Sequence, residues 1–306
     1  MASFRQKKCK VCFVIRQKKC SVCPLFVRKS VEFPSLFVGK SVYLHRLFVR
    51  KSVIMQRNIY NQLLRWKNKK TRKPLILNGA RQVGKTYILR EFGQKEYQKV
   101  AFFSLDRDQK VREVFEKSGS TADILMALSA ISQVDITPGD TLLVLDEIQD
   151  CPKALEALKF FCEETPDIHI VVAGSLLGLS LHDGTSYPVG KVEEMRLYPM
   201  TFLEFLNAMG KTQLVEIIEN KKWAVVNMLQ MELIGLLRQY YYVGGMPAAV
   251  RAHVEHNSLQ EIRSIQLQIL ADYRRDFSKH APAREVPRIN MVWDSIPPQL
   301  AKENKK

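Results

Sequence analysis

One short segment constrains the fold of this chain more than any other: the run Gly-Ala-Arg-Gln-Val-Gly-Lys-Thr at residues 79–86. It follows the apolar run at 74–78 and precedes a stretch from Tyr87 to about Tyr97 that is typical of a helix. Between a strand and a helix, the backbone N–H groups of such a loop form a cradle for a polyphosphate, whereas a chance match would be an ordinary Gly-rich turn. The sequence therefore predicts a phosphate-binding loop made of Gly79, Ala80, Arg81, Gln82, Val83, Gly84, Lys85 and Thr86.

Three side chains of this loop have individual interpretations. The spacing predicts that Lys85 reaches the β- and γ-phosphates of a nucleotide and that the Thr86 hydroxyl is a ligand of Mg²⁺. For Arg81 two interpretations stay open: its side chain contacts phosphate or a partner, or it faces solvent.

An acidic pair ends a second apolar run. Residues 141–145 are Thr-Leu-Leu-Val-Leu, a composition suited to a central parallel strand, and Asp146 and Glu147 follow directly. Ligands of such sheets bind at the carboxyl ends of the strands. We expect Asp146 to hold Mg²⁺ through water and Glu147 to polarise an attacking water, whereas the alternative is a solvated strand end followed by a turn.

Two further residues are candidates for the same site. Ser175 ends a third apolar run, 168–175, and is expected either to sense the γ-phosphate or attacking water or to be a plain strand-to-loop serine. Arg196 belongs to an expected strand at 192–197 and is either an arginine finger directed at a γ-phosphate or an exposed structural arginine.

From Met55 onward, apolar runs suited to strands alternate with helical stretches, which predicts an α/β domain. We expect the core at 55–210, a helical region at 211–285 and the start of a further domain at 286–306. Thr201 and Glu204 fit a helix capping box, and residues 244–247 form a breaker that is either a hinge or a loop. Residues 287–306 are expected to begin a small helix-turn-helix or winged-helix unit, which is one indication of DNA contact.

Residues 1–54 differ in character from the rest. They repeat every eleven residues and contain 13 of the 47 Lys and Arg residues but one of the 31 acidic residues. We interpret them as a disordered or non-native extension ahead of Met55. Two alternatives stay open: a transit peptide, and a zinc site formed by the pairs Cys9/Cys12 and Cys20/Cys23. Because most of the net charge of +16 lies here, it gives little support for nucleic-acid binding by the remaining chain.

Composition excludes several classes. Charged residues interrupt every apolar run well before the ~18 residues that a membrane-spanning helix needs, so no membrane segment is expected. The N-terminal charges also leave no apolar core for a secretion signal, which favours a cytoplasmic protein. The six histidines show no spacing typical of transition-metal ligands.

Five segments together resemble prokaryotic AAA-type P-loop ATPases, in particular the group whose AAA-like core is joined to a C-terminal domain of unknown function. They are residues 79–86, 146–149, 172–178, 196–205 and 242–247. The resemblance implies a P-loop NTPase three-layer core, with a five-stranded parallel sheet flanked by helices, and then a helical lid. It implies a Walker A role for Lys85, a Walker B role for Asp146, a catalytic role for Glu147 and a sensor-1 role for Ser175. Relatives usually extend further, which predicts a C-terminal truncation.

The predicted function is ATP binding and Mg²⁺-dependent ATP hydrolysis. The protein is expected to act as a molecular switch or motor on an unidentified macromolecule, protein or DNA. A homo-oligomer is possible, because AAA-type relatives are often oligomeric. A nucleotide-dependent binding module without useful turnover and a P-loop phosphotransferase are the alternatives. Adenine is favoured over guanine because the chain has no Asn-Lys-x-Asp sequence.

Overall fold

A computed structural model describes residues 55–175, 187–300 and 302, apart from the side chains of residues 278–280. The eleven-residue repeat and the four cysteines of the predicted zinc site lie outside these residues. A five-stranded, wholly parallel sheet forms the first part of the described chain, in the order β2-β3-β4-β1-β5. Its strands are β1 (Leu75–Gly79), β2 (Lys99–Ser104), β3 (Thr141–Asp146), β4 (His169–Ser175) and β5 (Glu193–Leu197).

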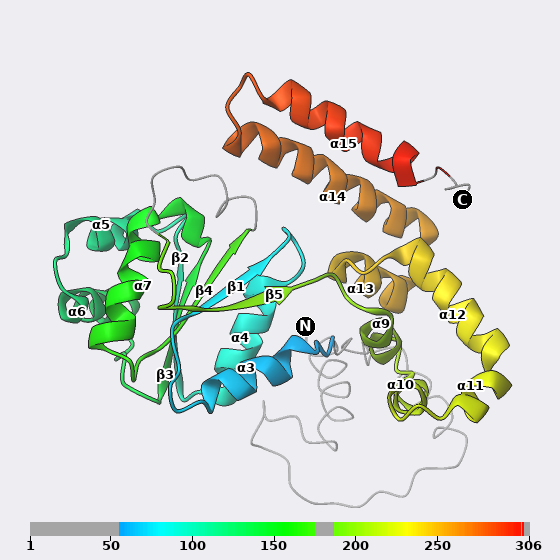
Figure 1. The fold of residues 1–306 in the computed structure, drawn as a ribbon, viewed down its shortest axis with the longest axis horizontal. Coiled ribbons are helices and arrows are strands. Elements are labelled where there is room, and N and C mark those ends of the chain that lie inside the picture. Colours follow the sequence, from blue (N-terminus) through cyan, green and yellow to red (C-terminus); the bar gives the residue numbers. More distant parts are fainter. Residues whose placement is uncertain (1–54, 176–186, 301, 303–306) are drawn as a thin grey trace, which may run out of the picture. The chain divides into compact units, whose positions relative to one another are not determined.

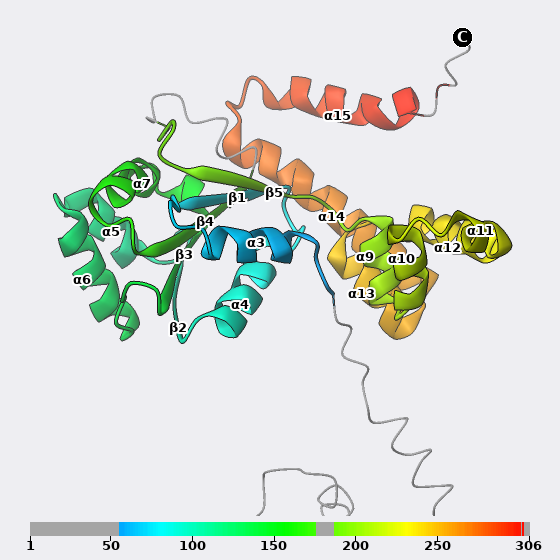
Figure 2. The ribbon, with the colours of Figure 1, turned by 60° about the horizontal axis from the view of Figure 1, so that its bottom comes forward.

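Helices cover both faces of this sheet (Figures 1 and 2). One face packs on α3 (Ile59–Lys67) and α4 (Lys85–Glu96) through a cluster that includes Leu63, Trp66, Leu89 and Phe92. The other face packs on α5 (Gln109–Lys117), α6 (Thr121–Ser132) and α7 (Pro152–Glu164). The three-layer α/β core with a parallel sheet is thus confirmed.

The three central strands, β1, β3 and β4, are buried along their whole length, as expected for parallel strands covered on both faces. Their register brings the carboxyl ends of neighbouring strands close together. Gly79 at the end of β1 pairs with Ser175 at the end of β4, and Leu145, one residue before the end of β3, pairs with Val172. The sheet therefore gathers the segments that follow β1, β3 and β4 along one edge.

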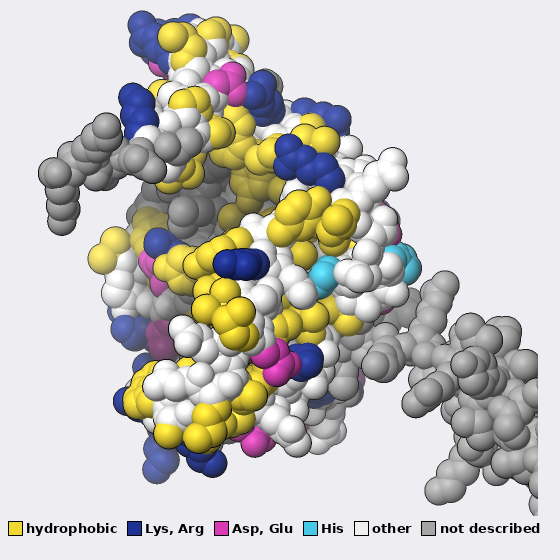
Figure 3. Space-filling view, turned by 90° about the vertical axis from the view of Figure 1, so that its right-hand side faces the viewer, with side chains coloured by type: hydrophobic (Ala, Val, Ile, Leu, Met, Phe, Trp, Pro, Cys, Tyr) yellow, Lys and Arg dark blue, Asp and Glu magenta, His cyan; other side chains and the backbone are white. Residues whose placement is uncertain are grey.

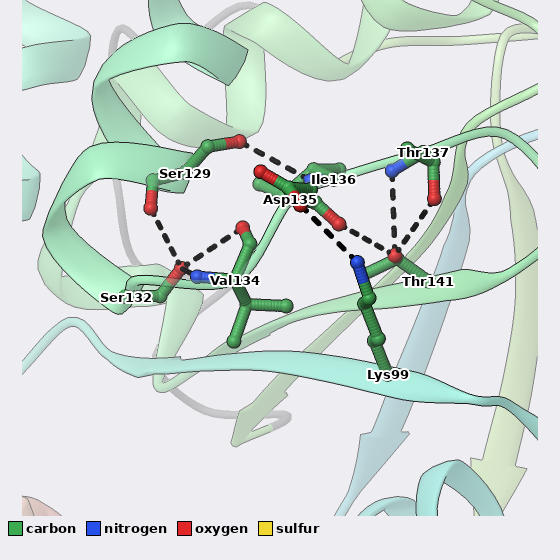
Figure 4. Close-up of polar contacts among 8 residues, drawn as sticks. All are labelled: Lys99, Ser129, Ser132, Val134, Asp135, Ile136, Thr137 and Thr141. Carbon is green, nitrogen blue, oxygen red and sulfur yellow. Dashed lines mark hydrogen bonds and ion pairs between the residues drawn. The ribbon is translucent and has the colours of Figure 1, made fainter.

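Hydrogen bonds fix the connection that leads into β3 (Figure 4). The Thr141 hydroxyl donates to the Asp135 carbonyl at 2.8 Å, and the Ile136 N–H donates to Ser129 Oγ at 3.2 Å. Lys99 at the start of β2 forms an ion pair with Asp135, with 3.2 Å between the charged atoms. These contacts anchor the beginning of β3 to α6 and β2, and hence the position of its acidic end.

The remaining described chain is helical. It contains α9 (Phe202–Ala208), α10 (Thr212–Glu219), α11 (Trp223–Met228), α12 (Gln230–Val243), α13 (Pro247–His256), α14 (Leu259–His280) and α15 (Val286–Leu300). The capping box of Thr201 and Glu204 is present at the start of α9. Residues 244–246 separate α12 from α13, and the Gly245 carbonyl accepts a hydrogen bond from the Met200 N–H at 2.7 Å. The helical region that the sequence predicts after the core is confirmed.

Large apolar side chains remain exposed on the helical region, and Figure 3 shows hydrophobic side chains gathered on this side of the molecule. Those on α11 and α12 include Trp223, Met228, Met231 and Tyr241. Within the described ranges, no helix combines the length and the apolarity needed to cross a bilayer.

Candidate functional site

The loop after β1 has the tight geometry that its glycines allow. A Cβ atom on Gly79 would lie 2.5 Å from the Leu197 carbonyl oxygen of β5, so only glycine lets the two strands approach this closely. Gly84 has a φ of 94°, in the left-handed region that disfavours other residues, and directly precedes the first residue of α4. The loop therefore delivers the chain into α4 with the helix N-terminus at the edge of the sheet.

Lys85 is folded back over the loop. Its Nζ donates hydrogen bonds to the carbonyl oxygens of Gly79 and Ala80, at 2.9 and 3.0 Å. Burial lowers the pKa of the ammonium, while the neighbouring carboxylates of Glu147 and Asp146 act in the opposite direction. A positive charge of the loop thus lies close to the acidic end of β3.

Thr86 and Asp146 are in direct contact. The Thr86 hydroxyl donates to Asp146 Oδ2 at 2.6 Å, and the other carboxylate oxygen accepts from the Glu147 N–H at 3.1 Å. Burial raises the pKa of Asp146, and the hydrogen bond from Thr86 partly offsets that effect.

A hydroxyl and a carboxylate side by side are the oxygen donors that suit Mg²⁺. Among the described residues, no group of three or more His, Cys, Asp and Glu side chains could enclose a metal. A Mg²⁺ ion bound here would therefore need oxygens from water and phosphate to complete its coordination, which is the usual arrangement for this ion at nucleotide sites.

Glu147 is joined to the end of β4 by a residue that the sequence analysis missed. Glu147 has a φ of 56°, and the short 3₁₀ helix Ile148–Asp150 follows it. From this turn the buried Gln149 donates to Glu147 Oε2 at 2.6 Å, and its side-chain oxygen accepts from the Ser175 N–H at 3.3 Å. The amide thereby links the predicted catalytic glutamate to the predicted sensor strand. The available signal was an amide two residues after the acidic pair.

A buried arginine, to which the sequence analysis gave no role, also contacts the loop. Arg57, two residues before the start of α3, donates to the Val83 carbonyl at 2.9 Å and forms an ion pair with Glu204 of α9 at 3.2 Å. Glu204 also accepts from the Asn58 N–H at 2.7 Å. Glu204 therefore has two roles: it completes the capping box of α9 and, through Arg57, it attaches the helical region to the loop.

Two neighbouring residues of the loop, the half-buried Arg81 and the exposed Gln82, contact α14. Arg81 forms an ion pair with Asp276, and the Gln82 amide donates to Asp272 Oδ2 at 2.8 Å. The Tyr273 hydroxyl donates to the Arg81 carbonyl at 2.9 Å. The Arg81 side chain is thus engaged by a helix that lies about 190 residues further along the chain.

Arg196 stands apart from this cluster. It is an exposed residue of the edge strand β5, opposite Asn78 and one row before the pairing of Leu197 with Gly79. Its role as an arginine finger stays a prediction. The structure does bring the other predicted residues together. Thr86 contacts Asp146 directly, Lys85 lies near the carboxylates of Asp146 and Glu147, and Ser175 is linked to Glu147 through Gln149.

Comparison with known families agrees with this arrangement. Residues 71–206 match a family described as "AAA domain", and residues 234–306 match one described as "Domain of unknown function (DUF8612)". The chain therefore contains an AAA domain that is followed by a C-terminal domain of unknown function, the combination that the resemblance predicts. The match to that domain begins within α12.

Several solved structures match the chain in part and share little sequence with it. A Walker-type ATPase of Pyrococcus abyssi is 14% identical with a TM-score of 0.48, over 76% of this chain and 78% of that one. The Aeropyrum pernix ORC1 protein in complex with DNA is 14% identical with a TM-score of 0.38, over 77% and 72%. Drosophila ORC bound to DNA is 15% identical with a TM-score of 0.40, over 75% and 69%. Among curated proteins, none matches the chain.

Proposed function

We propose that this chain binds ATP and hydrolyses it in a Mg²⁺-dependent reaction. The observation that carries the proposal is the direct contact between the phosphate-binding loop and the acidic strand end, where Thr86 Oγ1 lies 2.6 Å from Asp146 Oδ2. Oxygen ligands for a divalent cation therefore lie beside a loop suited to phosphates. This combination is the one that P-loop nucleotide hydrolases require.

The loop and Lys85 would bind the phosphates. Lys85 would exchange its hydrogen bonds to the Gly79 and Ala80 carbonyls for bonds to phosphate oxygens, which are stronger because both partners are charged. Thr86 and Asp146 would hold Mg²⁺, which when bound neutralises charge on the phosphates.

Glu147 would act on the attacking water. It would accept a proton as the water oxygen bonds to the γ-phosphorus, while the bond from that phosphorus to the bridging oxygen breaks and releases ADP and phosphate. Gln149 would act as a positioning residue, because its amide fixes one Glu147 carboxylate oxygen at 2.6 Å. Ser175, at the end of β4, would act as a sensor at the γ-phosphate end of the site. Its backbone N–H is bonded to the Gln149 amide, which links it to Glu147.

Hydrolysis is favoured over phosphoryl transfer to a small acceptor because an acidic residue next to Asp146 is suited to activating water. We further propose that turnover drives a switch or motor on a protein in the cytoplasm. The exposed apolar side chains of α11 and α12, Trp223 and Met231 among them, favour a protein partner or a second copy of the chain over DNA.

Phosphate release by the full chain with Mg²⁺ and ATP tests the proposal. Wild type is expected to release phosphate, and Glu147→Gln is expected to bind ATP with little release. Glu113→Gln, the same change at an ion-paired residue on the surface of α5, is the matched control and is expected to behave as wild type. If Glu147→Gln releases phosphate at the wild-type rate, Glu147 has no catalytic role. If wild type binds ATP without release, the nucleotide-dependent binding module replaces the hydrolase.

A further inference from the structure

A short stretch of α14 contacts the phosphate-binding loop through three consecutive interactions. Asp272 accepts from the Gln82 amide, Tyr273 donates to the Arg81 carbonyl, and Asp276 forms an ion pair with the Arg81 guanidinium. Positions 272, 273 and 276 lie on one face of a helix. Because α14 belongs to the match with the domain of unknown function, this face joins that domain to the nucleotide loop.

The carboxylates of this contact would repel the phosphates of a nucleotide bound in the loop. The hydrogen bond from Gln82 lowers the pKa of Asp272, which therefore carries a negative charge at neutral pH. Asp276 is 5% exposed and paired with a cation of the loop. A triphosphate in the loop would place further negative charge next to these carboxylates and would attract the same guanidinium, which suits phosphate in a bidentate geometry.

We propose that α14 is a latch that competes with the polyphosphate for Arg81, so that nucleotide binding and attachment of α14 to the loop oppose each other. The proposal rests on the nucleotide site proposed above and assigns the C-terminal domain the task of sensing its occupancy. When Arg81 turns to phosphate, the buried Asp276 loses an ion-pair partner, which weakens the attachment of α14. By linkage, anything that holds α14 on the loop lowers nucleotide affinity by the same factor.

The contact also reaches α15 through aromatic rings. The Tyr273 ring stacks on Trp293 of α15, with 5.9 Å between centroids and 18° between planes, and Phe277 meets the same indole edge-on at 5.2 Å. Figure 1 shows α14 and α15 side by side. A shift of Tyr273 relative to the loop would therefore change the surroundings of Trp293, which provides an optical signal.

Equilibrium binding of Mg²⁺-ATP to the full chain tests the latch. Asp276→Asn keeps the shape of the side chain but removes the charge that holds Arg81, and it is expected to bind ATP more tightly by on the order of 5- to 50-fold, a usual size for coupling between sites. Tyr273→Phe removes only the hydroxyl bond to the Arg81 carbonyl and is expected to shift affinity in the same direction by less. Asp294→Asn is the matched control, because that carboxylate pairs with Arg274 and not with the loop, and its affinity is expected to equal that of wild type.

Tryptophan emission supplies a second readout. Addition of Mg²⁺-ATP to wild type is expected to change the emission, and Trp293→Phe is expected to abolish that change although Trp66 and Trp223 remain. Equal ATP affinity in wild type, Asp276→Asn and Tyr273→Phe would overturn the latch while leaving the nucleotide site intact, as would an emission change that survives in Trp293→Phe. If wild type and every variant fail to bind ATP, the proposed function itself fails and the latch with it.

Discussion

The sheet edge and α14 both contribute to the candidate site, but they do so in different ways. At the sheet edge, Lys85, Asp146 and Ser175 each lie at the end of a buried strand or within a few residues of it. On α14, Asp272 and Asp276 are part of a 22-residue helix, and they reach the candidate site because that helix packs against the loop. Parallel topology places strand ends by itself, whereas a residue inside a helix gains a functional neighbour only through tertiary packing.

The sheet and the helical region also differ in the hydrogen bonding of their buried histidines. In the sheet, His169 Nδ1 is 2.7 Å from the Tyr97 hydroxyl. In the helical region, His253 is stacked on Phe205, and neither of its ring nitrogens has a hydrogen-bond partner in the described part of the chain. The buried histidine of the sheet is thus held by a hydrogen bond as well as by packing, whereas the buried histidine of the helical region is held by packing.

The largest expected effect concerns the ion pair that attaches the helical region, through α9, to the chain before α3. Glu204→Ala leaves the buried Arg57 without its counter-charge and is expected to lower the free energy of unfolding by about 3–5 kcal/mol. Glu232→Ala is the control, because its ion pair with Lys211 is roughly half exposed and is expected to contribute less than ~1 kcal/mol. Urea unfolding of both variants measures the difference, and equal losses would show that the buried pair does not join the regions.

The two histidines sharpen the comparison. His169→Phe leaves the buried Tyr97 hydroxyl unpaired and is expected to lower the free energy of unfolding by about 1–3 kcal/mol. His253→Phe removes two ring nitrogens without hydrogen bonds and is expected to be neutral or stabilising. Thermal or urea unfolding measures both changes, and a larger loss from His253→Phe would reverse the account of the two cores.

The free energy of unfolding is also expected to depend on pH through His169. Burial lowers the pKa of His169 to about 4, below the value near 6.5 of the unfolded chain. Its contribution is therefore fully present above pH ~6.5 and is lost as pH falls toward ~4, because protons bind the unfolded state more readily. His169→Gln is expected to flatten this part of the stability curve. A wild-type slope that persists in His169→Gln would assign the effect to other groups.

The next effect lies within the site. Gln149→Ala frees the Glu147 carboxylate and is expected to lower kcat of ATP hydrolysis about 10- to 100-fold, the cost of a misplaced catalytic group, with little change in ATP affinity. Gln149→Glu places a second carboxylate beside Glu147 and is expected to shift the acidic limb of the pH–rate profile. A purely structural role of Gln149 would leave that profile unchanged while lowering the amount of folded protein.

The smallest effect is expected at the exposed apolar face of the helical region. Met228→Ser and Met231→Ser, each at a side chain 83% exposed, are expected to change the free energy of unfolding by less than ~0.5 kcal/mol. Light scattering of the doubly substituted chain beside wild type tests whether the face binds a second copy. A loss of stability instead would show that these side chains pack against the folded chain.

The sequence was sufficient to predict the sheet and the loop because both depend on local pattern. The strands at 75–79, 141–146 and 169–175 are buried apolar runs, and the Gly-Lys-Thr sequence marks the start of α4. The sequence analysis gave no role to Arg57, because a lone arginine carries no spacing signal. It included Gln149 only as part of the segment 146–149 and gave no role to this amide, although it lies two residues after the acidic pair. The contact of Arg81 with Asp276 joins positions almost 200 residues apart, and nothing in either local sequence indicates the other.

Isothermal titration of the full chain with Mg²⁺-ATP tests the central claim most directly, namely that the loop at the end of β1 is a nucleotide site. Wild type is expected to bind one ATP per chain. Lys85→Ala is expected to weaken binding by about 2–5 kcal/mol, the cost of removing one partner of a buried charge pair. Lys95→Ala, an exposed lysine of the same helix, is the control and is expected to bind as wild type. Equal affinity of Lys85→Ala and wild type would contradict the account.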